Sequence, residues 1–394
     1  MLQNSTDPTL LPDCLRIKCI ESKFFVDDDF DETAHINRIR QQWTDNQEMY
    51  QIMVNPTLDC NLNCWYCYEN RIAGSKINAT IIEAIKKNMV SHYNETPYSC
   101  LKLSFFGGEP FLCFKAIKQL VNFADDFCEK NNVELILDFT SNATLIDNTV
   151  VEFLSEYRCH FQITLDGDEE QHIKVKRDAL GSNTYRQTLE ALQLIDSKIK
   201  KRYIAVRVNF DNRTLKCKDK IIEDISFLNR PTSFVILKKV WQVKTEKVDK
   251  EALMEAIQKL FDAKFLVDYY VMPKGCLCFA ERRNQVLVNY DGCIFKCTTI
   301  CSFDKDNALG TLVDNDTGKI TWHESTLKQW YDDMQPDYYK ECKWYPACMG
   351  ICNRQLMAHN GERICTFDAM NLTQKEYLMY LFKYNLLLKE LTGK

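Results

Sequence analysis

Apolar and polar residues alternate between two spacings along most of this chain. Between residues 50 and 240, short apolar segments typical of buried strands each precede a longer segment with apolar residues at helical spacing. Strands that alternate with helices favour βα units and a parallel sheet, so periodicity alone predicts an α/β fold. The expected strands are Tyr50–Asn55, Leu101–Phe106, Val133–Phe139, His160–Leu165, Tyr203–Phe210 and Phe234–Val240, and the expected helices are Ile77–Tyr93, Phe114–Lys130, Asn148–Tyr157, Thr184–Lys198, Asp219–Leu228 and Lys250–Phe265.

The two ends of the chain have a different character. Residues 1–46 are polar and irregular, which predicts a solvated segment or, alternatively, a cap or part of a docking surface for a substrate. From about residue 270 short segments and clustered cysteines follow, and a capping box of Thr373 and Glu376 opens a closing helix. We therefore expect an extension (1–46), a parallel α/β region (47–270), a cysteine-rich region (271–370) and a C-terminal helix (371–394).

Composition narrows the class of protein. The 394 residues are 45% hydrophobic, enough for a sizeable core, and the net charge of −5 gives no electrostatic case for nucleic acid or an anionic membrane. No run of about 18 apolar residues predicts a transmembrane helix, and the first residues lack the features of a signal peptide. Without an export signal, 19 cysteines favour metal or cluster ligation over disulfides, and we expect a cytoplasmic protein.

Three cysteines follow the first expected strand in the spacing C-x3-C-x2-C. They are Cys60, Cys64 and Cys67. Three thiolates fit a four-iron, four-sulfur cluster that keeps one iron open for chemistry. A zinc knuckle or three reduced structural thiols are the alternatives, but zinc usually takes four ligands in paired units and no fourth Cys or His lies close by. The position agrees with function at the carboxyl ends of parallel barrel strands.

This cysteine run, with the aromatic Tyr66 before its last cysteine, resembles the signature of the radical S-adenosylmethionine (radical SAM) enzymes. The resemblance implies a partial (β/α)6 barrel resembling a TIM barrel. It also implies that the amino and carboxylate groups of S-adenosylmethionine chelate the open iron of a [4Fe–4S] cluster. An electron from the cluster then cleaves the sulfonium to give a 5′-deoxyadenosyl radical, while the protein supplies binding, orientation and exclusion of side reactions.

Two polar turns at strand ends resemble further parts of the family's cofactor site. Gly107, Gly108 and Glu109 precede a proline after the second strand and match the family motif that contacts the methionyl amino group. Ser141 and Asn142 after the third strand resemble a Thr-Asn-Gly stretch near the cofactor, with alanine here in place of the glycine. Plain turns are the alternative at both places, since glycines and short polar residues favour turns in any fold.

Two charged residues on later strands also resemble family positions. Arg207 resembles an arginine that reaches the carboxylate or ribose of the cofactor, and a structural ion pair is the alternative. Asp166, in a Thr-Leu-Asp-Gly stretch that ends the fourth strand, resembles a family Ser-Leu-Asp-Gly. It would order the cofactor or substrate or take a proton, so it is our candidate catalytic residue; holding the turn is the alternative.

The second set of cysteines resembles the SPASM auxiliary-cluster domain of peptide-modifying radical SAM enzymes. By the family's assignment one cluster uses Cys278, Cys297 and Cys352, with Cys276 as a fourth ligand, and a second uses Cys342, Cys348 and Cys365. The second lacks a fourth thiolate because Tyr339 stands where the family usually has cysteine. Cys301, Cys293, Tyr339, a substrate or water could fill the place, the cluster could be altered or absent, or zinc could replace either cluster. The remaining cysteines are expected to be ordinary buried thiols: Cys14, Cys19, Cys100, Cys113, Cys128, Cys159 and Cys217.

These resemblances lead to three hypotheses for function. The first is a radical SAM/SPASM maturase that modifies a ribosomally made precursor peptide, with an electron donor such as flavodoxin or ferredoxin and, since only 46 residues precede the barrel, a separate leader-recognition protein or direct docking. The second is an anaerobic sulfatase-maturating enzyme that makes formylglycine. The third, of another class, is a non-catalytic iron–sulfur or zinc-binding electron-transfer protein.

Overall fold

The computed structural model describes residues 29–241, 246–270, 277–300, 302–312, 317–331, 341–342, 344–358 and 365–393, together with 12–14, 16–17, 27 and 339. Most of its strands belong to one sheet. The strands are β1 (Met49–Asn55), β2 (Leu62–Cys64), β3 (Cys100–Phe105), β4 (Glu134–Ser141), β5 (Arg158–Thr164), β6 (Lys176–Asp178), β7 (Arg202–Phe210), β8 (Ser233–Lys239), β9 (Leu266–Asp268), β10 (Gln285–Asn289), β11 (Cys293–Phe295), β12 (Gly310–Thr311) and β13 (Thr321–Trp322).

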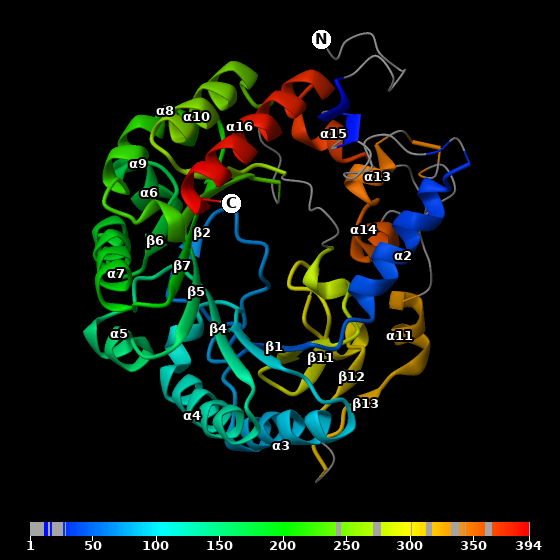
Figure 1. Cartoon of the computed structure of the whole chain (residues 1–394). Coiled ribbons are helices and arrows are strands. Elements are labelled where there is room, and N and C mark those ends of the chain that lie inside the picture. The colour runs from blue at the N-terminus through cyan, green and yellow to red at the C-terminus, as the bar shows by residue number, and fades with distance from the viewer. Residues whose placement is uncertain are drawn as a thin grey trace.

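The large sheet runs in the order β13-β12-β11-β10-β1-β3-β4-β5-β7-β8-β9. From β10 to β9 every neighbouring pair is parallel, and β11, β12 and β13 extend the β10 edge antiparallel. The sheet curves so that its helices lie on the outside (Figure 1). The expected α/β fold of the partial-barrel type is thus confirmed, with the six expected strands adjacent in chain order as β1, β3, β4, β5, β7 and β8.

Aspartate or asparagine side chains cap the start of most outer helices, which explains where those helices begin. Asn78, for example, accepts a hydrogen bond from the backbone N–H of Ile81 at 3.0 Å. The helices are α2 (Glu32–Thr44), α3 (Ala79–Glu95), α4 (Phe114–Asn131), α5 (Asn148–Leu154), α6 (Glu169–Val175), α7 (Thr184–Lys198), α8 (Asn212–Lys216), α9 (Lys218–Asp224), α10 (Lys250–Asp262), α11 (Glu324–Tyr331), α13 (Tyr345–Cys348), α14 (Asn353–Ala358), α15 (Thr366–Met370) and α16 (Gln374–Thr392).

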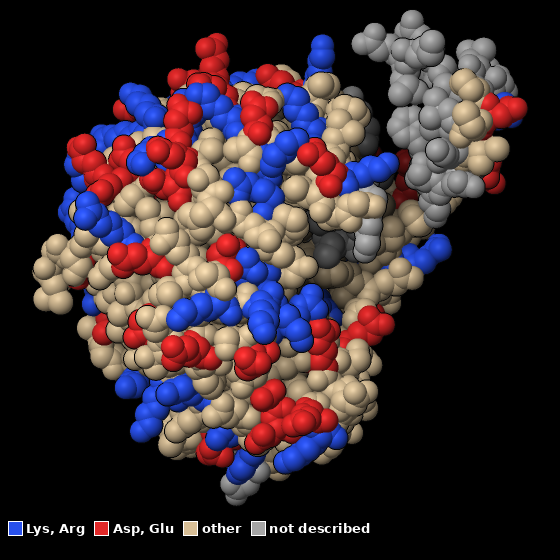
Figure 2. Space-filling model, turned by 60° about the vertical axis from the view of Figure 1, so that its left-hand side comes forward, with Lys and Arg blue, Asp and Glu red and all other residues tan. Residues whose placement is uncertain are grey.

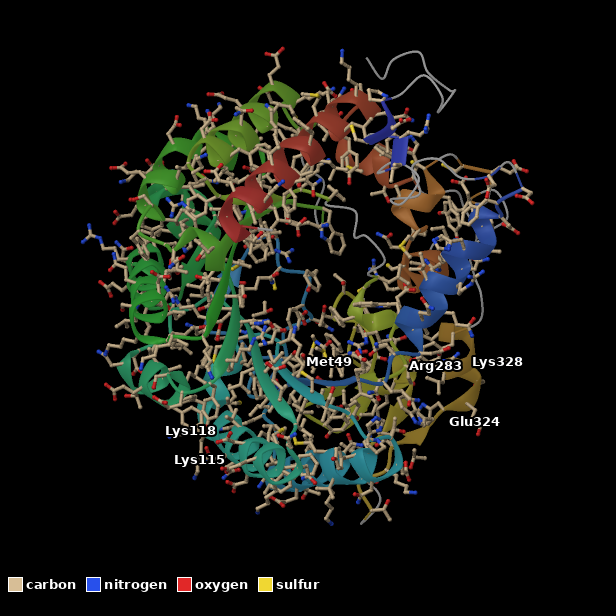
Figure 3. The ribbon with its side chains drawn as sticks, in the orientation of Figure 1. Met49, Lys115, Lys118, Arg283, Glu324 and Lys328 are labelled. Atoms are coloured by element: carbon tan, nitrogen blue, oxygen red, sulfur yellow. The ribbon has the colours of Figure 1, made fainter. Side chains whose placement is uncertain are left out.

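The core lies between this sheet and its outer helices. Phe105, Phe139 and Phe161 occupy register-matched positions on three neighbouring strands, and their rings stack with centroids 5.3 Å apart. Lys115 and Lys118 point away from the sheet on the exposed side of α4 (Figure 3), while the opposite side of that helix is buried. An apolar helix face on a continuous apolar sheet fixes the strands whose carboxyl ends carry the site.

The extension before the barrel departs from the prediction of an irregular segment. Residues 32–44 form α2, because Asp31 caps the helix by accepting from the Ala34 N–H at 2.8 Å and Ile36 is buried. The helix lies beside α13 and α14 of the C-terminal region (Figure 1). Its Arg40 donates to the carbonyl of Met349 and pairs with Glu281. Residues 32–44 thus pack on the C-terminal region, and their role as a cap or a docking surface stays a prediction.

The barrel and the cysteine-rich region share one sheet across the boundary expected at residue 270. Strand β10 pairs in parallel with β1 over five residues. Arg282 donates to the Met49 carbonyl at 3.1 Å, and the Arg283 N–H donates to the Thr44 carbonyl at 2.8 Å. Figure 3 labels Met49 and Arg283 at this junction. The C-terminal region is consequently anchored to the strand that leads into the cysteine loop.

The C-terminal helix α16 forms as expected, and its capping box of Thr373 and Glu376 is confirmed. Tyr380 lies in the core, where its hydroxyl donates to the Val267 carbonyl at 2.6 Å. The helix therefore covers the β9 end of the sheet. Acidic and basic side chains are interspersed over the face in Figure 2, and none of the described helices is long and apolar enough to cross a membrane.

Candidate active site

The cysteine loop leaves β1 at the carboxyl end of the strand, as the sequence predicts. Its middle forms β2, which pairs antiparallel with β6 so that Cys64 lies opposite Lys176. Burial raises the pKa of both Cys60 and Cys64 to about 11. The nearby charge of Cys64 adds to the rise at Cys60, and that of Cys67 adds to the rise at Cys64. Cys60 in turn contributes to the raised pKa of Cys67, after burial. The structure therefore brings the three predicted cysteines together.

Asp59 closes the base of this loop. Its carboxylate accepts hydrogen bonds from the Cys60 and Gly74 N–H groups, both at 2.8 Å, and from Arg71 at 2.9 Å. The Gly74 N–H contributes most to lowering the pKa of Asp59. A carboxylate that satisfies several donors within one loop holds that loop in a single shape.

The glycines of the GGEP turn have a structural reason that motif matching does not reveal. Gly107 has a φ of +103°, and a Cβ there would lie 2.3 Å from the Thr57 carbonyl oxygen. A Cβ on Gly108 would lie 2.0 Å from the Asp59 carbonyl oxygen. The turn is thus packed directly against the backbone that enters the cysteine loop, a contact that only glycine permits.

Glu109 connects this turn to the Ser141–Asn142 turn. Its fully buried carboxylate accepts from the Ser141 hydroxyl at 2.9 and 3.0 Å, from the Asn142 N–H at 2.9 Å and from the Phe111 N–H at 3.1 Å. Burial raises the pKa of Glu109 to about 7, although these bonds oppose the rise. These donors engage both oxygens of the Glu109 carboxylate in this arrangement. The predicted contact of Glu109 with a cofactor stays a prediction.

Asn142 completes the connection to the cysteine loop. Its amide donates to Asn61 at 3.0 Å and lies 3.8 Å from the sulfur of Cys60. Ala143 has a φ of +66°, a conformation that favours glycine, which is the residue the family usually has here. The Ser-Asn-Ala turn therefore places its alanine in a left-handed conformation at the position where the family usually has glycine.

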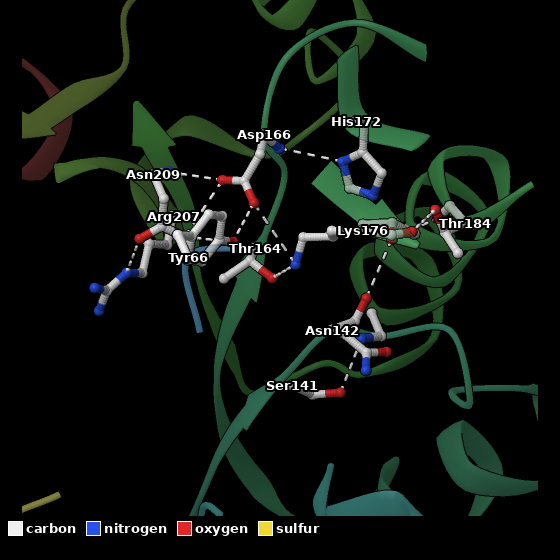
Figure 4. Close-up of polar contacts among 12 residues, drawn as sticks. Tyr66, Ser141, Asn142, Thr164, Asp166, His172, Lys176, Thr184, Arg207 and Asn209 are labelled. Atoms are coloured by element: carbon white, nitrogen blue, oxygen red, sulfur yellow. Dashed lines mark hydrogen bonds and ion pairs between the residues drawn. The ribbon is translucent and has the colours of Figure 1, made fainter. Parts of the chain in front are cut away.

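Asp166 lies in a closed network (Figure 4). One oxygen accepts from Tyr66 at 2.5 Å, and the other accepts from the Asn209 N–H at 2.7 Å. The Nζ of Lys176 lies 3.8 Å away, and Asp166 itself has no exposed surface. This network holds Tyr66 between two of the cysteines. The role predicted for Asp166, taking a proton directly, is not what this geometry favours, and it stays a prediction.

Arg207 lies at the edge of the same network. Its Nε donates to the Asn209 side chain at 2.9 Å, and its guanidinium points away from Asp166 (Figure 4). Arg207 is close enough to Tyr68 to lower the pKa of that hydroxyl, which burial and Glu69 raise. The predicted arginine thus stands on the side of the loop that bears Tyr68.

Sequence reasoning missed two charged groups of the site. Lys176 is 2% exposed and lies among the cysteines and Asp166. Both carboxylate oxygens of Glu69 are buried without a hydrogen-bond partner of good geometry, and burial raises the pKa of Glu69 to about 8. The only sequence signal for either was position: Glu69 follows Cys67 by two residues, and Lys176 follows the Asp166 turn.

Two further groups of cysteines converge in the C-terminal region. Cys297 and Cys352 both contribute to the pKa of Cys278, which burial raises to about 12. Cys342 and Cys365 likewise add to the effect of burial on Cys348. These groups have the membership that the resemblance implies. Cys276 and Cys301 lie outside the described residues.

The candidates for the missing ligand of the second group lie apart from each other. Tyr339 is buried in an apolar cluster with Ile36 and Tyr345, and its carbonyl accepts from the Cys342 N–H at 3.0 Å. Cys293 is buried in another apolar cluster, on β11. The Tyr339 position is thus beside the second group, whereas Cys293 is not. Of the cysteines expected to be ordinary buried thiols, Cys14 is exposed, Cys217 is half-buried, and Cys19 lies outside the described residues.

One local device recurs in all three cysteine groups. A backbone N–H two residues further along the chain donates to the cysteine sulfur, which favours the thiolate that binds iron. These pairs are Leu62 to Cys60 (3.4 Å), Thr299 to Cys297 (3.3 Å) and Gly350 to Cys348 (3.4 Å). In contrast, buried Cys159 donates its S–H to the Leu154 carbonyl. The donor sets therefore fit iron–sulfur clusters, where hydrogen bonds to sulfur are common.

Two other features set the limits of the site. Among the described residues no three His, Cys, Asp or Glu side chains are placed to hold a single metal ion, whereas a four-iron cluster separates its thiolates more widely. A hollow lined by Glu134, Arg158 and Arg202 lies at the amino ends of the strands. It is therefore remote from the carboxyl ends, where the cysteines lie.

Comparison with known proteins agrees with this geometry. Residues 54–225 match the model of the Radical SAM superfamily. A cysteine-type anaerobic sulfatase-maturating enzyme of Clostridium novyi is 22% identical over 329 residues, 75% of this chain and 85% of the relative. An uncharacterised protein of Methanocaldococcus jannaschii is 27% identical over 278 residues, 69% of this chain and 91% of that protein.

The fold is also that of a solved structure, native anSMEcpe with bound AdoMet and a Kp18Cys peptide. The TM-score is 0.62 at 19% identity, and the match covers 88% of this chain and 100% of that one. Members of the radical SAM family use a [4Fe–4S] cluster and S-adenosylmethionine, which the three grouped thiols fit. Residues 54–225 therefore form a radical SAM domain, and the chain as a whole is similar to the anaerobic sulfatase maturases.

Proposed function

We propose that this enzyme modifies a ribosomally made peptide by hydrogen abstraction, forming a cross-link or another oxidative modification. Cys60, Cys64 and Cys67 would hold the [4Fe–4S] cluster. When bound, the cluster and S-adenosylmethionine together supply a 5′-deoxyadenosyl radical that takes a hydrogen from the substrate. The single observation that carries this proposal is the convergence of three thiols on a loop braced at the carboxyl end of β1.

The protein's own contribution would be positioning. The GGEP turn holds the backbone at Thr57 and Asp59 against the strand ends, and Glu109 holds the Ser141–Asn142 turn beside Cys60. We propose that Gly107, Gly108, Ser141 and Asn142 present backbone and amide groups to S-adenosylmethionine. Orientation of this kind lowers a barrier because the reacting atoms are already aligned.

A second positioning network would order the opposite side of the loop. Asp166 and Asn209 fix the hydroxyl of Tyr66, and Arg207 extends from the same strand toward Tyr68. We propose that Arg207 reaches the carboxylate or ribose of S-adenosylmethionine. Because the network is buried, it also helps to exclude water from a radical reaction.

The two C-terminal groups would hold one or two auxiliary clusters. Cys278, Cys297 and Cys352, with Cys276, would bind the first, and Cys342, Cys348 and Cys365 the second. Such clusters would accept the electron left on the product or anchor the peptide. Cys297 contributes to the raised pKa of Tyr68, after burial and other charges. This proximity supports a first group that faces the radical site. A peptide bound between them would contact both centres.

A peptide as the substrate is supported by the relatives. The compared sulfatase maturase acts in protein maturation by its name, and the solved structure contains a bound peptide. We further propose a one-electron donor such as flavodoxin or ferredoxin, and either direct docking of the precursor or a separate leader-recognition protein. A reduced, cytoplasmic setting would suit the described cysteines, which are free thiols.

Formylglycine formation on a sulfatase is the second candidate, because three of the curated relatives carry that name. A peptide with a sulfatase motif tests it: conversion of its cysteine to formylglycine under anaerobic conditions would favour this activity. Failure, together with a mass change in a short peptide encoded beside the enzyme, would favour the first. A mass change of two hydrogens is the expected result for cross-linking.

The activity itself is tested with the anaerobically purified protein, dithionite and S-adenosylmethionine. Formation of 5′-deoxyadenosine by the wild type, and its loss in the Cys60/Cys64/Cys67→Ala variant, is the expected outcome. Cys159→Ala is the matched control, since that thiol is buried and donates to a carbonyl. A wild type with iron but no 5′-deoxyadenosine would instead favour a non-catalytic electron-transfer protein.

A further inference from the structure

Lys176 is a buried cation placed against the cysteine loop. The β2–β6 pairing puts it directly opposite Cys64, and only 2% of the residue is exposed. Its Nζ donates to the Thr164 hydroxyl and lies 3.8 Å from Asp166 (Figure 4). Burying a lysine is costly unless negative charge lies close to it. The burial of Lys176 therefore requires negatively charged groups close to its ammonium.

The charged groups that face Lys176 come from several elements. Asp166 pairs with it, and Glu109 and the three thiols of the cysteine loop are near enough for the lysine to lower their pKa values, against the larger effect of burial. His172 adds no second cation, because burial and Lys176 itself hold its pKa well below the ordinary value. Lys176 thus lies close to two acids and three thiols.

We propose that Lys176 is a positioning residue that sets the reduction potential of the cluster held by Cys60, Cys64 and Cys67. The inference rests on the proposed function, since it assumes that these cysteines bind a cluster. Reduction adds one electron, supplied by a donor of the flavodoxin or ferredoxin class, and neither makes nor breaks a bond. A fixed positive charge nearby stabilises the reduced form more than the oxidised form, and so raises the potential.

Local dielectric strengthens this effect. Lys176, Asp166 and Glu109 are buried, so water screens their charges weakly, whereas Cys60 and Cys64 are half-buried and Cys67 is exposed. Hydrogen bonds, net charge and solvent exposure are the protein's means of setting cluster potentials. Lys176 changes the net charge from β6, directly opposite Cys64. It is therefore better placed than Lys174, the exposed lysine of the neighbouring helix α6.

The test is the midpoint potential of this cluster, followed by electron paramagnetic resonance in a dithionite titration without S-adenosylmethionine. All variants carry auxiliary-cysteine substitutions so that one cluster contributes. Removing Lys176 alone would also leave its partner Asp166 as an unpaired buried carboxylate, which changes a second charge next to the cluster. The informative comparison is therefore Asp166→Asn against Asp166→Asn/Lys176→Met.

We expect the double variant to be harder to reduce than Asp166→Asn by at least tenfold in equilibrium constant, about 59 mV for one electron. Lys176→Arg should keep the wild-type potential, and Lys174→Met should not change it, because Lys174 is exposed and pairs with Glu170. Equal potentials for Asp166→Asn and the double variant, both with a full cluster signal, would overturn the inference. A wild type without any cluster signal would instead refute the proposed function.

Discussion

The cysteine loop after β1 and the cysteine groups of the C-terminal region hold their thiols with different amounts of supporting structure. Both use backbone N–H groups two residues ahead to stabilise a sulfur. The loop is packed against the ends of a parallel sheet, with its shape fixed by Asp59 and by the glycines at 107 and 108. In the second C-terminal group, Cys348 ends α13 and Cys365 caps the start of α15, which are helices of four and five residues.

This difference teaches where the geometry of each site comes from. A loop held by strands exists before any metal binds, because the sheet and its helices are stable through their own core. Short helices bury little apolar surface, so a region built from them takes much of its stability from what it binds. Here α2 supplies the additional support, through Arg40 and Ile36.

Removing cysteines separates the two regions most sharply. Cys60/Cys64/Cys67→Ala should abolish 5′-deoxyadenosine formation and lower iron by about four per chain, because the open-iron cluster is lost. Cys342/Cys348/Cys365→Ala should lower iron by a similar amount yet keep 5′-deoxyadenosine formation. Iron, sulfide and nucleoside analysis of the anaerobically purified proteins measures both expected results. The comparison breaks if the second variant also fails to cleave S-adenosylmethionine.

The glycine contact gives the next largest effect. Gly108→Ala places a Cβ 2.0 Å from the Asp59 carbonyl oxygen, so the loop must move, and a shift of about 1 Å in a reacting site costs about 100-fold in rate. The rate of 5′-deoxyadenosine formation measures it. Gly181→Ala is the matched control, since a Cβ there meets no atom within 4 Å and its φ of +71° costs only about 1 kcal/mol. Similar losses in both variants would contradict a specific role for the contact at Gly108.

The same contrast explains what could be predicted from sequence. The parallel strands were predictable because each is a buried apolar run, and the cysteines and the GGEP turn because their spacing is a motif. Strand β6 could not be predicted: its Lys176-Arg177-Asp178 is polar and becomes a strand only by pairing with β2. Similarly, β10 follows the expected domain boundary yet joins β1.

The missed parts of the site share a physical cause. Lys176 is an ordinary lysine in the sequence, and its burial arises from the packing of β6 behind the cysteine loop. Glu109 was predicted to face a cofactor, but its bonds to Ser141 and Asn142 depend on how two loops meet. Burial and contacts between loops are tertiary properties, which periodicity and spacing do not encode.

The support from α2 can be weakened without touching a cysteine. Arg40→Ala removes the cation that pairs with buried Glu281 and a donor to the Met349 carbonyl, a loss of about 3 kcal/mol for a buried pair. We expect the auxiliary iron to fall while the cluster of the β1 loop is retained. Each cluster is quantified by spectroscopy for Arg40→Ala, both alone and combined with Cys60/Cys64/Cys67→Ala. Arg38→Ala, exposed on the same helix, should behave as wild type, and loss of both clusters in Arg40→Ala would contradict a local role.

The smallest effect concerns Glu109, inside the better-braced region. Burial raises its pKa from 4.5 to about 7 in the folded protein, so between these values the folded state holds a proton that the unfolded state has lost. The stabilisation is complete below about pH 4.5 and disappears as the pH rises through 7, by about 3 kcal/mol. Urea unfolding of the metal-free protein at pH 5 and pH 8 should therefore show a smaller loss for Glu109→Gln than for wild type. Glu129→Gln, exposed at the end of α4, should keep the wild-type loss, and an unchanged loss in Glu109→Gln would mean that the Ser141–Asn142 turn keeps this carboxylate ionised throughout.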